Sequence, residues 1–74
     1  MTESRKPQLL DMVAILDRAG DDSVETGDVG TVVELLPPDA VEVEFLGRDG
    51  RTRGVSTFPV SQVLVLNRDR TPVG

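Results

Sequence analysis

The sequence contains no histidine, cysteine, tryptophan or tyrosine, and these absences remove several kinds of chemistry. Without histidine there is no imidazole to act as a base near neutral pH. Without cysteine there is no thiolate nucleophile, no disulfide and no conventional zinc or iron–sulfur site. Serine and threonine hydroxyl groups therefore have no evident base to activate them. We expect no catalytic residue, no metal site and no cofactor in this chain.

Long hydrophobic runs are also missing, so no membrane span is expected. The first residues, which include Glu3, Arg5 and Lys6, do not form the pattern of a signal peptide. The lack of cysteine agrees with a reducing compartment. These features predict a cytoplasmic protein.

The length of 74 residues allows one domain with a small core. Apolar residues and turn formers alternate between residues 9 and 66, whereas the two ends have little apolar pattern. We therefore expect one domain over residues 9–66, with a flexible tail at residues 1–8 and another at residues 67–74.

Five short segments have the composition of β-strands. The clearest is Val41–Phe45, in which apolar residues alternate with two glutamates and therefore point to one face. Asp49-Gly50 follows as a hairpin signal, because glycine accepts a positive φ. Pro59 and the polar residues after it predict a single helical turn. Strands are expected at residues 11–16, 30–36, 41–45, 51–57 and 63–66.

Short strands in so small a domain favour a barrel, because closing a sheet removes its exposed edges. We expect an all-β fold, a small five-stranded barrel with one short helical turn before the last strand.

Two stretches make this order of elements similar to that of an SH3-like barrel. Residues 26–35 resemble the KOW-type motif, where a glycine enters a strand and an apolar residue follows two positions later. Residues 59–63 resemble the one-turn helix that closes such barrels. The resemblance implies an SH3-like barrel in which the first and last strands lie together.

The chain more closely resembles a family of small bacterial proteins of unknown function, over roughly residues 9–66. The stretches that carry this likeness are Leu9–Val13, Gly27–Glu34, Glu42–Phe45 and Asp49–Thr52. Some members of that family resemble antitoxin-like or accessory proteins encoded beside toxin-like domains. A similar role is what the resemblance implies for this chain.

Charge is distributed unevenly along the chain, whose net charge is -5. Residues 17–44 hold nine acidic side chains and one arginine, whereas residues 45–74 hold five arginines and two aspartates. An acidic field repels nucleic-acid phosphates and attracts basic partners. Nucleic acid is therefore not the expected partner, although a KOW-like nucleic-acid-binding module remains the alternative. It would use Arg48, Arg51, Arg53, Arg68 and Arg70.

The first and last predicted strands are apolar on both faces, which indicates an interaction surface. If Val13, Ile15, Val63 and Val65 point inward, an outer patch remains, formed by Met12, Leu16, Leu64 and Leu66. The alternatives are that the tails, with Leu9 and Leu10, fold over this patch, or that these side chains close the ends of the barrel.

Three glutamates, Glu34, Glu42 and Glu44, are expected on the solvent face of the neighbouring strands, where they would attract a basic partner. Two simpler interpretations are that the acids only keep the protein soluble, and that Arg51 and Arg53 pair with Glu42 or Glu44. The sequence thus predicts a non-enzymatic module that binds another protein with a basic surface, and self-association through the outer patch is compatible with this.

Overall fold

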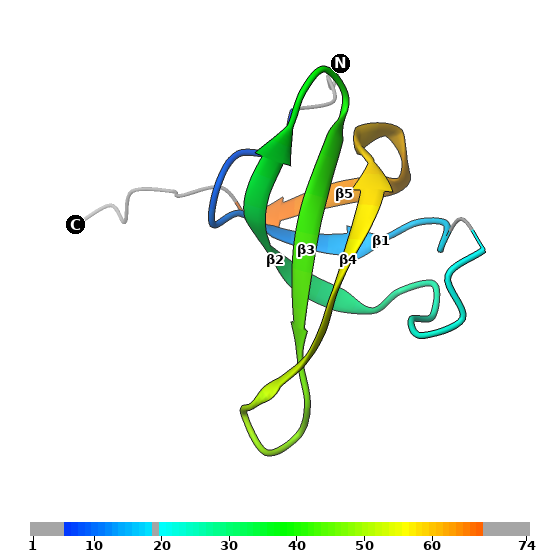
Figure 1. The fold of residues 1–74 in the computed structure, drawn as a ribbon, viewed down its shortest axis with the longest axis vertical. Helices are drawn as coiled ribbons and strands as arrows, with labels where there is room; N and C mark the ends of the chain where they lie inside the picture. Colours follow the sequence, from blue (N-terminus) through cyan, green and yellow to red (C-terminus); the bar gives the residue numbers. More distant parts are fainter. Residues whose placement is uncertain (1–5, 19, 68–74) are drawn as a thin grey trace.

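The computed structural model describes residues 6–18 and 20–67, and these residues form an antiparallel β structure (Figure 1). The predicted tails fall largely outside this range, as do Arg68 and Arg70. One 3₁₀ turn, η1, accompanies the strands. The elements are β1 (Met12–Ile15), β2 (Val29–Leu36), β3 (Ala40–Leu46), β4 (Thr52–Pro59), η1 (Val60–Gln62) and β5 (Val63–Asn67).

The five strands belong to one sheet, in the order β4-β3-β2-β1-β5. Every neighbouring pair is antiparallel, and the first strand pairs with the last. The predicted all-β fold, its five strands and the helical turn before the last strand are confirmed. In Figure 1, β1 and β5 run across the direction of β3 and β4, so the sheet folds over on itself.

Strand β4 is longer than expected, because it continues through Phe58 and Pro59. Phe58 lies opposite Val41 and is fully buried, so core packing extends the strand. Pro59 ends β4, a strand at the edge of the sheet where a missing N–H is tolerated.

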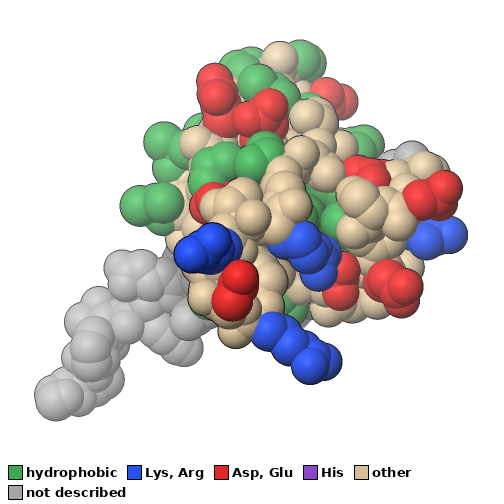
Figure 2. All heavy atoms as spheres, turned by 60° about the horizontal axis from the view of Figure 1, so that its bottom comes forward, with side chains coloured by type: hydrophobic (Ala, Val, Ile, Leu, Met, Phe, Trp, Pro, Cys, Tyr) green, Lys and Arg blue, Asp and Glu red, His purple; other side chains and the backbone are tan. Residues whose placement is uncertain are grey.

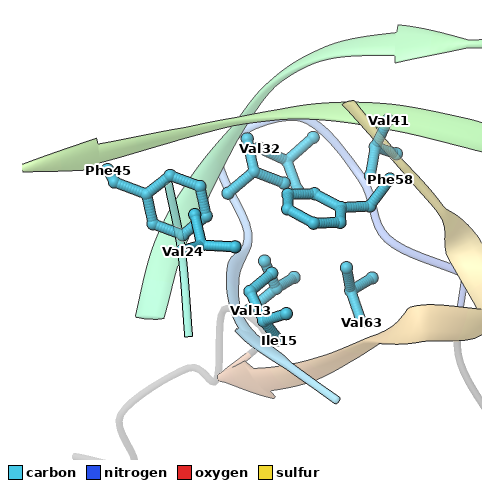
Figure 3. Packing of buried hydrophobic residues seen from close by; sticks show 9 residues of the cluster. Val13, Ile15, Val24, Val32, Val41, Phe45, Phe58 and Val63 are labelled. Atoms are coloured by element: carbon cyan, nitrogen blue, oxygen red, sulfur yellow. The ribbon is translucent and has the colours of Figure 1, made fainter. Parts of the chain in front are cut away.

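The core lies inside the folded sheet and consists of seven aliphatic side chains and two phenylalanines (Figure 3). Val41, Val43 and Phe45 are buried on one face of β3, as their alternation predicted. The rings of Phe45 and Phe58 meet edge to face, with centroids 6.2 Å apart. The remaining buried hydrophobic residues are Val13, Ile15, Val24, Val32 and Val63.

Strand β2 belongs to both halves of the folded sheet. Its first residues pair with β1 and its last ones pair with β3, and its register shifts between Val32 and Glu34. A bulge of this kind bends and twists a strand. Gly30 allows the close approach of the strands here, because a Cβ at this position would lie 2.5 Å from Val43 Cγ1 and 2.7 Å from the Glu44 carbonyl oxygen.

The turn between β3 and β4 contains the predicted Asp49-Gly50 pair. Gly50 has a φ of 82° and donates its N–H to the Gly47 carbonyl at 3.0 Å. The Asp49 carboxylate accepts the Arg51 N–H at 3.0 Å. The hairpin therefore forms where the sequence placed it.

Candidate interaction surface

The four residues of the predicted apolar patch all lie on the outer face of the sheet, which is the face turned away from the core. Val13, Ile15 and Val63 are buried and Val65 is partly buried, so the alternate side chains point outward. These outward side chains retain about half of their exposure: Met12 45%, Leu16 51%, Leu64 49% and Leu66 47%. We call these four residues the apolar patch.

Leu9 and Leu10 do not bury the patch. Their own exposed fractions are 55% and 75%, and the Leu10 N–H is bound to the Val32 carbonyl at 2.8 Å. Leu10 therefore lies along β2. Among the residues that the structure describes, nothing removes the patch from solvent.

The strand register connects the apolar patch to the predicted glutamates. Met12 lies opposite Thr31, and Thr31 lies opposite Glu44 on the other side. In the next row Ala14 lies opposite Val29, which is 45% exposed. Val29 thus extends the apolar surface toward β2, and sequence reasoning missed it because β2 begins one residue earlier than predicted.

The three glutamates share the outer face of β2 and β3, and we call them the acidic strip. Glu34 lies directly opposite Glu42, and Glu44 follows on the same face of β3. The Glu44 carboxylate accepts a hydrogen bond from the Thr52 hydroxyl. Like charges placed directly opposite each other destabilise a sheet, and no ion pair to these glutamates occurs in the described part of the chain. The strip therefore presents uncompensated negative charge.

The expected pairing of Arg53 with Glu42 or Glu44 is wrong. The β3–β4 register shifts after Phe45, so that Gly54 opposes Phe45 and Thr52 opposes Leu46. Arg53 is the extra residue of this bulge. Its guanidinium donates to Asp28 Oδ2 at 3.1 Å, and its Cζ lies 5.5 Å from the centroid of the Phe45 ring.

Basic side chains near the β3–β4 turn lie beside acidic ones. Figure 2, which brings the lower end of Figure 1 forward, shows arginine and lysine interspersed with aspartate and glutamate. Arg48 and Arg51 are exposed in this region, and Asp49 stands between them in sequence. The positive charge of the second half of the chain therefore does not form a continuous field here.

Two aspartates of the β1–β2 loop have lowered pKa values. Hydrogen bonds from the hydroxyl groups of Ser23 and Ser56 are the main cause for Asp21, whose carboxylate also accepts the Ser23 N–H at 2.8 Å. The Asp28 carboxylate accepts a hydrogen bond from the Glu25 N–H at 3.0 Å, and this bond is the main cause of its lowered pKa. The Arg53 guanidinium lowers the pKa further. These bonds stabilise the ionised carboxylates and tie the loop to β4.

This arrangement predicts a loss of stability in acid. Because the pKa of folded Asp28 lies below its ordinary value of 3.8, the stabilisation is present above pH 4 and disappears as the pH falls through the folded pKa. Asp28→Asn should lower the free energy of unfolding near neutral pH by up to about 1 kcal/mol. The difference from the original protein should shrink toward pH 3 in urea unfolding. Asp39→Asn, at an exposed turn, is the control, and an equal pH dependence in both variants would contradict the assignment.

The residues that the structure describes contain no group of three metal-ligating side chains. A hollow of about 200 Å³ between residues 6–8 and the β2–β3 turn has Lys6 as its only ionisable lining residue. A second, of about 150 Å³ beside β4, has only Arg53. Within residues 6–18 and 20–67, no helix is long and apolar enough to cross a membrane.

Comparison with known families identifies the chain by its core segment. Residues 9–65 match the family described as a domain of unknown function, DUF4926. The chain belongs to this family. The matched DUF4926 segment contains all five strands up to Val65, and hence the outer face that carries the apolar patch and the acidic strip. No similarity to a curated protein or to a solved structure was found.

Proposed function

We propose that this DUF4926 protein is a non-enzymatic interaction module, an accessory or antitoxin-like partner of another bacterial protein in the cytoplasm. Its binding surface is the outer face of the sheet. The observation that carries the proposal is the uncovered apolar patch beside an acidic strip that lacks ion pairs in the described chain. The pairing of β1 with β5 and the η1 turn support an SH3-like barrel as the scaffold.

The apolar patch would supply most of the binding free energy. Burial of apolar surface contributes roughly 25 cal/mol per Å², and each of the four side chains still has about half of its surface to bury. The backbone of these paired strands is already ordered before binding, which lowers the cost of association. Such a surface suits a partner with its own apolar face.

The acidic strip defines the charge of that partner. Glu34 and Glu42 repel each other across β2 and β3, so a lysine or arginine placed between them would relieve the repulsion. Complementary charges also increase the association rate and exclude acidic partners. The partner is therefore a protein with basic residues next to an apolar surface.

Leu64→Asp should abolish capture of such a partner while leaving the domain folded, because the Leu64 side chain is half exposed. We expect a loss of at least about tenfold in affinity, since the few dominant residues near the centre of an interface each cost about 2 kcal/mol or more when truncated. The measurement is affinity purification of the tagged protein from its own organism with quantitative mass spectrometry, followed by calorimetry with the purified partner.

Leu46→Asp is the matched control, because Leu46 is 55% exposed at the end of β3 and the substitution adds the same charge away from the apolar patch. A partner retained by the control and lost by Leu64→Asp would support the proposal. Recovery of no specific protein, or equal loss in both variants, would reject it.

Nucleic-acid binding by the KOW-like alternative is less favoured, because Arg53 is bound by Asp28. A titration with labelled RNA at low and high salt separates the two functions, since phosphate contacts weaken steeply as salt rises. Tight, salt-sensitive binding would favour the alternative.

A further inference from the structure

The sheet has two edge strands, β4 and β5, and they differ in how they are protected. An edge strand presents unpaired N–H and C=O groups that can pair with another chain, and natural proteins protect such edges with charges, proline or covering loops. The strand order leaves β4 and β5 each with one paired side.

Hydrogen bonds on β1 show how the backbone groups alternate. The Ile15 N–H donates to the Asp28 carbonyl at 2.8 Å, and its carbonyl accepts the Gly27 N–H at 2.7 Å, so both groups point toward β2. The Leu16 N–H donates to the Gln62 carbonyl at 2.9 Å, on the β5 side. Successive residues of β1 therefore direct their backbone groups to opposite neighbours.

By the same alternation, Ala14 directs its backbone groups toward β5, where it lies opposite Leu64. The backbone N–H and C=O of Leu64 must then point back to β1, and those of Val63 and Val65 point toward the free edge of β5. The Val63 N–H is already bound to the Val60 carbonyl. The free edge of β5 thus offers the Val63 carbonyl and both backbone groups of Val65.

The edge of β4 is protected. Val24 of the β1–β2 loop is buried and lines a hollow beside β4, and Ser56 is hydrogen-bonded to Asp21 of that loop. Pro59 lacks an N–H and Arg53 places a charge on the strand. By contrast, residues 63–66 of β5 contain neither a charge nor a proline, and no described residue pairs with the outer edge of β5.

We propose that the free edge of β5 pairs with β5 of a second copy of this chain. The two strands would run antiparallel around a two-fold axis and join two five-stranded sheets into one. The pairing is centred on Val65, whose N–H and C=O bond reciprocally to those of Val65 in the second copy.

This pairing is self-complementary in shape and charge. Leu64 lies opposite Leu66 of the second copy on the outer face, and the two partly buried Val65 side chains meet on the inner face. The register shift between β5 and β1 makes Leu66 the extra residue, because Val65 lies opposite Val13 and Asn67 lies opposite Met12, and it leaves Val63–Val65 regular. The uncompensated glutamates lie on β2 and β3, so repulsion between two chains of net charge -5 is weakest at this edge.

The dimer would also place the two apolar patches side by side, since Leu64 and Leu66 remain on the outer face. The pairing uses backbone groups of β5, whereas the proposed partner binds side chains of that face. The proposed dimer therefore does not depend on the proposed function, and each can be tested without the other.

Sedimentation equilibrium from micromolar to millimolar protein tests the proposal. The mass should rise from 8.0 kDa toward twice that value. Leu66→Lys should raise the dimer dissociation constant at least about tenfold, because two lysines would approach the apolar leucines opposite. Val55→Lys, equally exposed on β4, should leave the constant unchanged. A mass of one chain at every concentration would overturn the proposal.

Val65→Pro removes the N–H at the centre of the pairing and leaves all four patch side chains in place. It should abolish the dimer and retain partner capture, whereas Leu64→Asp abolishes capture. If Val65→Pro does not fold, hydrogen exchange of the backbone amides in the original protein tests the pairing instead. The Val65 amide should be protected at high concentration and lose protection on dilution, while the Leu64 amide stays protected. A Val65 amide that exchanges at one rate throughout, fast or slow, would refute pairing between copies.

Discussion

Phe58→Ala is expected to lower the free energy of unfolding by about 3–5 kcal/mol, the usual cost of removing a fully buried phenylalanine. The Phe58 side chain has no exposure and its ring meets that of Phe45 edge to face. A domain of 74 residues has about 4–11 kcal/mol of stability in total, so the variant should lose a large part of it. Thermal and urea unfolding followed by circular dichroism measure this loss.

Phe58→Leu is the matched variant, because it keeps an apolar side chain at the same position and should cost less than half as much as alanine. Val55→Ala serves as the surface control on the same strand, where half of the side chain is already in solvent. A Phe58→Ala protein as stable as the Val55→Ala protein would show that β4 does not close the core as described.

Gly30→Ala is expected to destabilise the protein by about 1–3 kcal/mol through overpacking. The new Cβ would lie 2.5 Å from Val43 Cγ1, 2.7 Å from the Glu44 carbonyl oxygen and 3.0 Å from Phe45 Cδ1. One of these neighbours is backbone, so the clash cannot be relieved by a side-chain rotation alone. The strands β2 and β3 would have to separate.

Gly54→Ala provides the control, because nothing lies within 4 Å of a Cβ at this position. Its backbone does not adopt a positive φ, so alanine should be neutral or stabilise the protein by up to about 1 kcal/mol through the unfolded chain. Urea unfolding of both variants gives the comparison. Equal stabilities would mean that β2 and β3 do not approach closely at Gly30.

The apolar patch could be predicted from sequence because it depends only on local alternation. Once Val13 and Ile15 point inward, Met12 and Leu16 must point outward, and the same holds for Leu64 between Val63 and Val65. Leu66 is the extra residue of a bulge opposite β1, and its side chain is half exposed in the structure. The turn at Asp49-Gly50 was predictable for a similar reason, since its geometry depends on adjacent residues alone.

The partner of Arg53 could not be predicted, because a bulge changes which face a side chain occupies. Alternation alone placed Arg53 on the solvent face beside Glu42 and Glu44. The register shift after Phe45 instead brings it to Asp28, which is 25 residues away in sequence. Val29 was missed because β2 begins one residue earlier than predicted, where it pairs with Ala14 of β1.

The sequence by itself determined the strands, the turn at Asp49-Gly50, the buried faces of β1, β3 and β5 and the lack of histidine and cysteine chemistry, because these follow from composition and from spacing within a few residues. The tertiary structure alone decided the strand register, the three bulges at Val33, Arg53 and Leu66, and the difference between the protected edge of β4 and the bare edge of β5. Those features depend on contacts between residues far apart in the chain, which local patterns do not encode.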